Sequence, residues 1–342
     1  MVGKCKIAGA IIFLVGLHLV ILFAGFFATG DPAAQDRDFP FAPPTRLHLV
    51  DSHGHLHFRP FVYRYVSNTN DDHYEEVRDH EYPVHLLVSG SRYKAAGVFP
   101  SHTHLLGVEA PAKIFLAGTD NYGRDQFSRI LYGGQVSLAA GVLATAISLC
   151  LGLIVGCLSG FYGGWIDESA MRSAELFLVL PWLYLLLAVR AFLPIHLSPI
   201  ETFFIVVAVI GTVGWARPAR LVRGIVLSAK TRQYVVASRG FGASDVYILR
   251  RHILPHVRAI LLTQAALLVP QYVIAEVTLS FFGLGLSEPT PSWGNLLATL
   301  QQYNVLVSYW WMFAPASALT IVSLGYLGVA NAFQQRLQSG SI

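Results

Sequence analysis

The chain has 342 residues, of which 54% are hydrophobic and only 13% are charged. Soluble domains carry about 25% charged residues, so this composition excludes a water-soluble globular protein and indicates an integral membrane protein. The net charge of +4 does not indicate a nucleic-acid partner. Nine Lys and Arg against one acidic residue lie between 217 and 258, beside apolar stretches, as expected for a cytoplasmic loop of a membrane protein.

Six apolar stretches are long enough to cross about 30 Å of hydrocarbon. They fall near 7–28, 135–160, 174–193, 200–217, 257–284 and 308–332. The first follows Lys4 and Lys6 and lacks a small-x-small cleavage site, so we expect an uncleaved span rather than a signal peptide. Six spans place both termini on one side, and the Lys and Arg distribution predicts that this side is cytoplasmic.

The second apolar stretch carries a small residue at every fourth position: Ala140, Ala144, Ser148, Gly152, Gly156, Gly160 and Gly164. Residues four apart share one helix face, so this pattern predicts a face that approaches another helix closely. Lining of a transport pathway is the alternative. Pro181 and Pro270 interrupt the third and fifth stretches and predict bends, either static kinks or hinges of a gate.

Residues 30–117 form a polar segment that is too long for a simple loop. Within it, residues 47–50 and 55–58 alternate around a turn at His53-Gly54, which predicts a β-hairpin. We therefore expect a small β-containing external insert. The chain then divides into a first transmembrane helix, the insert, a five-helix core with a basic loop at 217–256, and a cytoplasmic tail, with bounds 1–29, 30–117, 118–335 and 336–342.

The histidines of this insert raise the question of a metal site. If the hairpin turn has two residues, three imidazoles share one face and would suit zinc, copper or nickel: His48, His55 and His57. Arg59 would share that face and oppose a cation, and no Cys or helical His pair accompanies the histidines. We therefore predict an exposed strand face with no metal site.

The basic loop contains a segment, residues 234–255, with the features of a docking element. Its small residues, Ala237, Ser238, Gly242 and Ala243, predict two helices joined by a tight turn that fits a groove on a soluble partner. Ser244 is expected to cap the second helix, and Asp245 suits the positive end of its dipole. Pro255 is expected to end the pair before the fifth span.

Four further ionisable residues require an explanation. Asp120, Arg124 and Asp125 lie just before the second span, where they are expected to be structural or to face an external partner. Glu276 lies within the fifth apolar stretch, near its external end. A charge in a membrane is a functional hypothesis by default, so we predict either a place on the transport path or a pair with a neighbouring helix.

Three blocks in this order carry a resemblance to a known family. They are 118–125, 242–255 and 279–285, the last continuing into Pro289-Thr290-Pro291-Ser292-Trp293-Gly294-Asn295. Together they resemble the permease subunits of binding-protein-dependent ABC importers, in the dipeptide, oligopeptide and nickel branch. The family's cytoplasmic motif, Glu-Ala-Ala, three residues, Gly, nine residues, Ile, one residue, Leu-Pro, matches Val236, Ala237, Ser238, Gly242, His252, Leu254 and Pro255 with its spacing intact.

Two positions depart from that motif. Val236 replaces the usual Glu, which removes one polar contact to the ATPase unless Arg239 and its neighbours replace it. His252 replaces the general Ile, although a His before Ile-Leu-Pro is familiar in the peptide branch.

The resemblance implies an all-α membrane protein with six transmembrane helices, without cofactors of its own. Its partners would be a second, similar permease, two cytoplasmic ATPase subunits that carry ATP and Mg, and an external solute-binding protein. The substrate would be a short peptide, imported across a bacterial inner membrane; nickel or another small solute is the alternative within the branch. The sequence has no phosphate-binding loop or hydrolase motif, so we expect no catalysis. A secondary transporter is the alternative from a different class, but no inverted repeat is visible.

Overall fold

The computed structural model describes residues 2–67, 74–191, 194 and 197–338. These form two compact units, each assembled from segments distant in the sequence. Unit 1 comprises 1–14, 138–285 and 321–342, and unit 2 comprises 15–137 and 286–320. Three helices contain residues assigned to both units: α1 (Val2–Leu22), α3 (Gln126–Tyr162) and α13 (Ala314–Gln338).

Unit 1 is helical. Besides parts of the three shared helices it contains α4 (Gly164–Val179), α5 (Trp182–Ala191), α6 (Pro199–Val213), α7 (Ala216–Lys230), α8 (Gln233–Gly240), α9 (Asp245–Ile248) and α10 (Leu254–Phe281). Apolar side chains of α3, α5, α6 and α10 meet in one buried core that includes Ala140, Ala144, Leu186, Val206, Ile210, Leu268 and Leu279. This core joins stretches of chain up to about 140 residues apart.

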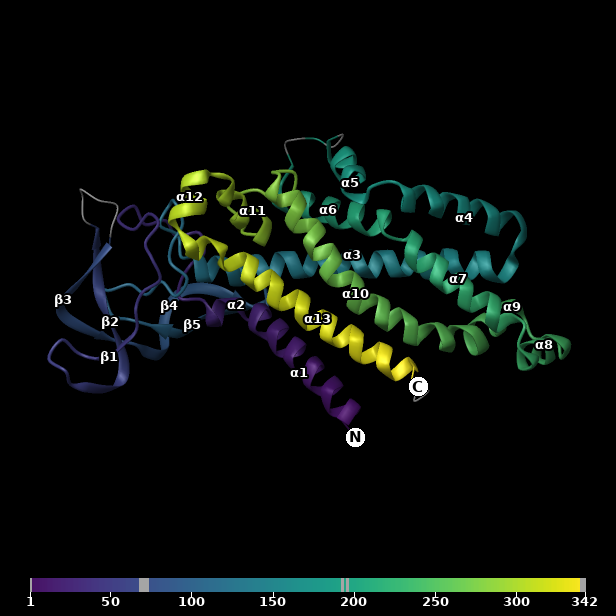
Figure 1. Cartoon of the computed structure of the whole chain (residues 1–342), viewed down its shortest axis with the longest axis horizontal. Coiled ribbons are helices and arrows are strands. Elements are labelled where there is room, and N and C mark those ends of the chain that lie inside the picture. Colours follow the sequence, from purple (N-terminus) through teal and green to yellow (C-terminus); the bar gives the residue numbers. More distant parts are fainter. Residues whose placement is uncertain (1, 68–73, 192–193, 195–196, 339–342) are drawn as a thin grey trace. The chain divides into compact units, whose positions relative to one another are not determined.

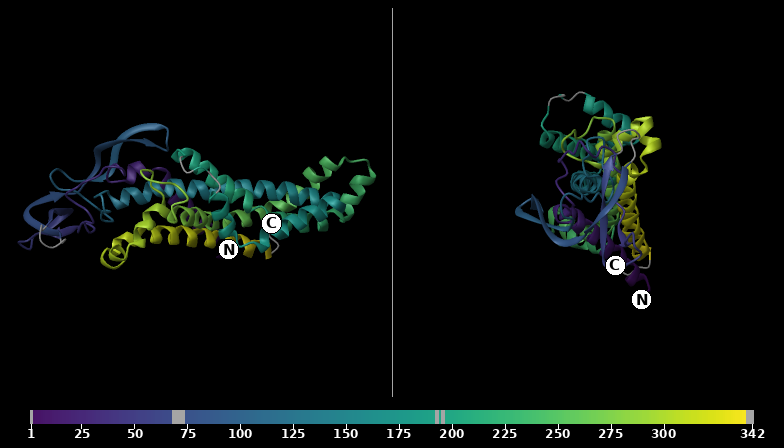
Figure 2. Two further views of the ribbon diagram at one scale, coloured as in Figure 1. Left: turned by 90° about the horizontal axis from the view of Figure 1, so that it is seen from above. Right: turned by 90° about the vertical axis from the view of Figure 1, so that its left-hand side faces the viewer.

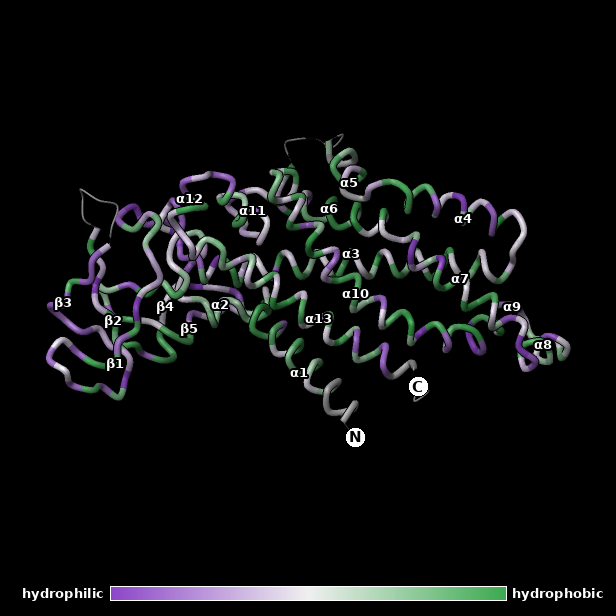
Figure 3. The backbone as a smooth tube through the Cα atoms, in the orientation of Figure 1, coloured by the Kyte–Doolittle hydropathy of each residue, from purple (hydrophilic) through white to green (hydrophobic). Residues whose placement is uncertain are grey.

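Three helical stretches among the described residues are long and apolar enough to cross a membrane: Gln126–Tyr162, Asp245–Phe281 and Trp310–Gln335. Helices α6 and α7 qualify together as a broken span or a re-entrant loop, bent by 42°. A shorter apolar helix covers Ala8–Leu22, and Figure 3 shows the hydrophobic residues concentrated along these helices. A polytopic helical membrane protein is therefore confirmed, while the count of six spans stays a prediction.

The predicted third span differs most from the structure, because its described part is not one helix. Helix α4 ends at Val179 and α5 begins at Trp182. Leu180 has an extended backbone, with φ −67° and ψ 132°, as expected for a residue that precedes a proline. Pro181 therefore separates two helices, whereas Pro270 lies inside α10, which continues through it.

The small-residue face of α3 approaches other helices closely, as predicted, and its glycines pack on α7. A Cβ added to Gly152 would lie 3.0 Å from the amide nitrogen of Ala219, and one added to Gly156 would lie 2.6 Å from the Ala219 carbonyl oxygen. One added to Gly160 would lie 2.8 Å from Val226 Cβ. Only glycine allows the two helices to approach this closely. Gly164 does not belong to this face, because α3 ends at Tyr162.

Unit 2 contains two antiparallel sheets within the segment predicted to hold a β-containing insert. The first has the order β1 (His48–Val50), β2 (Leu56–Ser67) and β3 (Tyr74–Pro83); the second pairs β4 (His85–Ala95) with β5 (Phe99–Gly107). Buried Val62, Val84, Ala112 and Ile114 form the core beside them. The short helices of this unit are α2 (Ala24–Phe27), α11 (Trp293–Ala298) and α12 (Tyr303–Ser308).

The predicted hairpin forms, but its turn is longer than two residues. The Asp51 amide donates to the His55 carbonyl (3.0 Å), and Gly54 has φ +87°. His48 consequently does not join His55 and His57. It lies 3.1 Å from Glu76 Oε1 instead, whereas His55 and His57 both contact Asp51. His48 and His57 both pack against the Phe61 ring, with ring centres 5.9 and 5.0 Å apart. The predicted two-residue turn is therefore wrong, and only His55 and His57 share a partner.

Candidate coupling site

The 234–255 segment folds into the predicted pair of helices, α8 and α9, which form a hairpin at the end of the helices of unit 1 (Figures 1 and 2). Gly242 ends α8 with φ +83°. The amide of Ala243 donates to the Ser238 carbonyl (3.1 Å) and that of Gly242 to the Arg239 carbonyl (3.0 Å). This is a Schellman ending, which requires a residue in the left-handed region, so the glycine fixes the turn.

Side chains on both sides of the turn stabilise it. Ser244 Oγ accepts a hydrogen bond from the Tyr247 amide (3.3 Å), which forms the predicted cap. Arg239 Nη2 donates to Asp245 Oδ1 (3.4 Å), and its guanidinium lies 5.3 Å from the centre of the Phe161 ring. Arg239 is thus held by this structure and is not simply a free surface charge.

Pro255 does not end the helical pair, contrary to the prediction. Residues Asp245–Phe281 form one continuous helical stretch of 37 residues. A π-helical turn covers Leu249–Ile253, where the Leu254 amide donates to the Leu249 carbonyl, and α10 begins at Leu254. Pro255 therefore lies in the first turn of α10, where a missing amide hydrogen costs little.

The two faces of this hairpin differ in burial. Val235, Ile248 and Ile253 are buried against a core that includes Phe161, Val222, Val226, Ala229 and Val257. Five large apolar side chains of the hairpin are exposed: Tyr234, Val236, Phe241, Val246 and Tyr247. Phe241 is 93% exposed. A patch of exposed apolar residues on a firmly packed base is typical of a protein interaction site.

The residues predicted to form the coupling site differ in their exposure to solvent. Half of them are exposed: Val236, Ala237, Arg239, Gly242 and Ser244. The other half are partly buried: Ser238, Ala243, Asp245, Leu254 and Pro255. Val236, at the position where the resembled family has Glu, is 59% exposed. The side chain at this position is thus available to a partner.

An ion pair that the sequence did not indicate fixes the helix before the hairpin. Arg223 of α7 donates from Nε to Asp167 Oδ1 (2.5 Å) and from Nη2 to Asp167 Oδ2 (2.6 Å). Lys230, at the end of α7, donates to the Gly160 carbonyl (2.8 Å). Helix α7 is therefore attached to α3 and α4 by charged contacts as well as by glycine packing.

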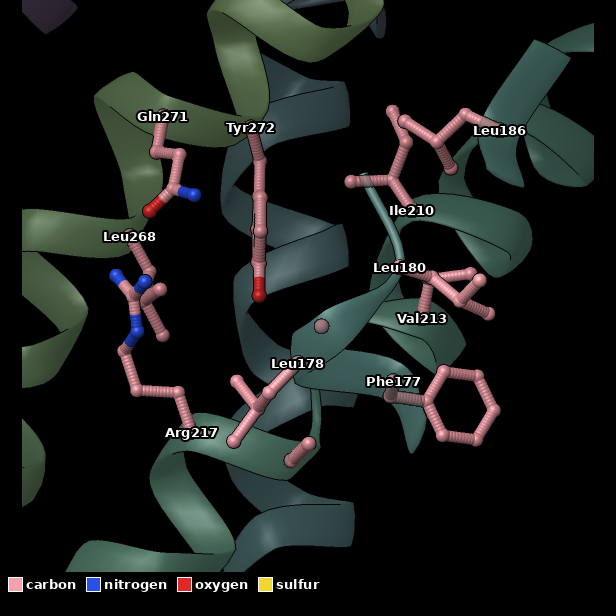
Figure 4. Close-up of a pocket in the computed structure, with 12 residues that line it drawn as sticks. Phe177, Leu178, Leu180, Leu186, Ile210, Val213, Arg217, Leu268, Gln271 and Tyr272 are labelled. Carbon is pink, nitrogen blue, oxygen red and sulfur yellow. The ribbon is translucent and has the colours of Figure 1, made fainter. Parts of the chain in front are cut away.

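A cavity of about 120 Å³ opens among α4, α5, α6, α7 and α10 of unit 1. Figure 4 shows the Tyr272 hydroxyl pointing into it, with Gln271 and Arg217 on one side and the apolar Leu180 and Val213 on the other. The Tyr272 hydroxyl and Ser148 Oγ lie 2.9 Å apart.

Glu276 does not line that cavity. Its side chain is fully buried in unit 1, and Oε1 accepts a hydrogen bond from Ser280 Oγ (2.7 Å) on the same helix. Gly285, in the turn after α10, lies directly against Ser280. The predicted role of Glu276 on a transport path is not tested by these contacts and stays a prediction.

The charged block before α3 is structural in unit 2. Asp120 Oδ2 accepts from Arg124 Nε (2.6 Å), and Asp120 Oδ1 accepts from the amides of Tyr122 (2.8 Å) and Arg124 (3.0 Å). Glu288, which sequence reasoning missed, then accepts from Arg124 Nη1 (2.8 Å) and Arg129 Nη2 (2.7 Å). Two buried guanidinium groups thus share one partly exposed carboxylate. The only sequence signal was that Glu288 is the single charged residue between 285 and 307.

Asp125 has a separate role at the start of α3. Its Oδ2 accepts hydrogen bonds from Thr29 Oγ1 (2.7 Å) and from the Ser128 amide (2.8 Å), so it caps the helix and contacts the N-terminal chain. Burial raises the pKa of its carboxyl, although the hydrogen bonds from Ser128 and Thr29 lower it. Asp125 therefore favours the neutral form more than an exposed Asp does.

Comparisons with known proteins identify the protein family of the chain. A family model described as "Binding-protein-dependent transport system inner membrane component" matches residues 148–339, a range that includes the whole hairpin. The dipeptide transport system permease protein DppC of Bacillus subtilis is 35% identical over 221 residues, which cover 64% of this chain and 67% of that protein. The oligopeptide transport system permease protein OppC of the same organism is 36% identical over 242 residues, 69% of this chain and 76% of that protein.

Among solved structures, a crystal structure of an amino acid ABC transporter with histidines aligns with 61% of this chain and 94% of its own, at 17% identity and a TM-score of 0.46. The sequence matches extend over more than half of the chain and include the hairpin α8–α9 and the long helix α10. The chain belongs to the family of inner membrane components of binding-protein-dependent transport systems.

Proposed function

We propose that this chain is the permease subunit of an ATP-driven importer of short peptides in the bacterial cytoplasmic membrane. Family membership supports a transport role, and the two relatives described above are named as dipeptide and oligopeptide permeases. Those names favour a peptide over nickel or another small solute. Membership in a family of binding-protein-dependent components also disfavours a secondary transporter.

The observation that carries the proposal is the exposed apolar face of the hairpin α8–α9. Tyr234, Phe241 and Tyr247 present aromatic surface on a hairpin whose other side is anchored by buried Val235 and Ile248. Such a face loses its unfavourable contact with water when it enters a groove on a soluble partner. In this proposal the partner is one of two ATPase subunits, which bind ATP and Mg; this chain itself catalyses nothing.

Six spans are consistent with the helices. They would be α1, α3, α4 with α5, α6 with the first turn of α7, α10 and α13. Lys and Arg concentrate between 217 and 258, so the positive-inside rule supports a cytoplasmic hairpin and cytoplasmic termini. The insert 30–117 would then be external, where it could meet the solute-binding protein. The division at 1–29, 118–335 and 336–342 remains part of this proposal, and residues 339–342 lie outside the described residues.

The transport path would form between this chain and a second, similar permease. The cavity with Arg217 and Gln271 supports a place for this path in unit 1, because a polar side chain in an apolar span is by default functional. The cavity would need to widen in another conformation to admit a peptide. Glu276 remains a candidate for a residue that controls this change, through its contact with Ser280.

The proposal is tested with Phe241→Ser in the assembled transporter. Loss of this exposed ring should reduce co-purification of the ATPase subunits and uncouple ATP hydrolysis from peptide uptake, while leaving the fold of the permease intact. Phe99→Ser is the matched control, because Phe99 is also a largely exposed phenylalanine, at 69%, but lies on β5. Retention of ATPase subunits and of coupled uptake by Phe241→Ser would contradict the docking assignment.

A further inference from the structure

The three-stranded sheet of unit 2 brings together side chains that no function described above uses. Asp51 follows β1, His57 lies on β2 and Glu81 lies on β3. One ligand atom from each, a nitrogen of His57 and a carboxylate oxygen of Asp51 and Glu81, lies within 4.8 Å of the other two. We propose that these three residues bind a divalent transition-metal ion, with zinc as the best-suited metal.

The distances fit one shared ion. His57 Nε2 lies 3.2 Å from Asp51 Oδ2 and 3.5 Å from Glu81 Oε2. Nitrogen and oxygen ligands of a tetrahedral zinc stand about 2.0–2.2 Å from the metal, which places them roughly 3.3–3.6 Å from each other. The ligand atoms therefore need to move by only about 1 Å to surround an ion.

The loop after β1 holds Asp51 in place for this role. Asp51 Oδ1 accepts hydrogen bonds from the amides of His53 (2.8 Å) and His55 (2.8 Å), so Oδ2 alone faces the imidazoles. The Asp51 side chain is only 7% exposed. Hydrogen bonds to the second oxygen of a carboxylate ligand fix its orientation, as outer-shell contacts of metal sites do.

A fourth ligand is available beside these three. His55 Nδ1 lies 3.1 Å from Asp51 Oδ2, and its side chain is 77% exposed, so it can turn toward the ion. The charge balance is also favourable, because two carboxylates neutralise a divalent cation. Among the described residues, Asp51 and Glu81 form ion pairs with histidines and none with Arg59. The charge of Arg59, which argued against a metal site in the sequence, is therefore not paired with this cluster.

The ligand set selects the class of metal. An imidazole with carboxylates suits zinc and similar transition metals, whereas magnesium and calcium prefer oxygen ligands alone. A bound ion would connect the β1–β2 loop directly to β3. In the sheet, β1 is hydrogen-bonded to β2, and β2 lies between β1 and β3. The ion would therefore fasten the edge strand β1, which has only three residues, to the rest of the sheet.

The test measures binding of Zn²⁺ alone to the full chain, purified in detergent without a polyhistidine tag and stripped with a chelator. We expect one zinc per chain by elemental analysis and an affinity, measured against a chromophoric chelator, that falls at least tenfold in His57→Ala and in Glu81→Gln. Glu81→Gln keeps the shape of the side chain, so it decides the result if His57→Ala fails to fold. His102→Ala, an exposed histidine of β5, is the control and should bind as the wild type does.

Two results would overturn the site. One is a wild-type chain that retains no zinc at micromolar concentrations, which would leave the cluster as hydrogen-bonded imidazoles and carboxylates. The other is zinc binding that is equal in wild type, Glu81→Gln and His57→Ala, which would place the ion on other histidines. Neither result depends on peptide transport, so the metal site and the proposed function stand or fall separately.

Discussion

The packing of α3 on α7 allows a quantitative comparison between two glycines. In Gly156→Ala the new Cβ would lie 2.6 Å from the Ala219 carbonyl oxygen and 2.7 Å from Val222 Cβ. Both distances are shorter than van der Waals contact, and one neighbour is backbone, so the helices must separate. Gly224→Ala on α7 is the matched control, because nothing lies within 4 Å of its added Cβ.

Both substitutions gain the same helix propensity, about 1 kcal/mol relative to glycine. Only Gly156→Ala also incurs overpacking, which costs about 1–3 kcal/mol. We therefore expect Gly156→Ala to be less stable than Gly224→Ala by about 1–3 kcal/mol. The thermal midpoint of the isolated chain in detergent, followed by circular dichroism, should differ by roughly 1–4 °C between the two variants. Equal midpoints would refute the inference that these glycines set the distance between α3 and α7.

Two further predictions concern the charged residues of unit 2. Glu288→Gln removes the carboxylate that Arg124 and Arg129 share. Because Glu288 is partly exposed and water can replace it, the substitution should lower the free energy of unfolding by only about 1–2 kcal/mol. Glu109→Gln, at an exposed site, is the control and should change the thermal midpoint little. Burial raises the pKa of the Asp125 carboxyl in the folded chain. The protonated carboxyl therefore stabilises the fold fully below the unfolded pKa of about 3.9, and this stabilisation is lost as pH rises through the folded pKa. Asp125→Asn should therefore gain stability relative to wild type between about pH 4 and pH 7, and a constant difference in midpoint would contradict this.

The parts of the structure that sequence could predict are those with local causes. The turn at Gly242, the cap at Ser244 and the close packing of Gly152, Gly156 and Gly160 each depend on residue type and spacing within one or two turns of helix. The bend at Pro181 was also predicted, although its effect is stronger than a bend, because Leu180 becomes extended.

The parts that sequence missed depend on pairing between distant segments. Glu288 meets Arg124 and Arg129 across about 160 residues of sequence, and nothing in a single sequence indicates which carboxylate two arginines share. The cluster of Asp51 and Glu81 was missed because it follows from the register of β2 with β3 and from a turn of more than two residues. The register of β1 with β2 is irregular between His48 and Val50, so the positions of the histidines could not be counted from a two-residue turn.

The wrong prediction at Pro255 bears most directly on how docking could be coupled to transport. Because α9, the π-helical turn and α10 are continuous, 37 residues of helix extend for about 55 Å from the exposed hairpin to Phe281. A helix of this length transmits a displacement of one end to the other, whereas a break at Pro255 would have absorbed it. The π-helical turn is the place where this helix departs from regular geometry, and such turns are frequent at functional sites. A movement imposed by a partner on the exposed Val246 or Tyr247, both within this stretch, would therefore reach the buried contact of Glu276 with Ser280 through a single element.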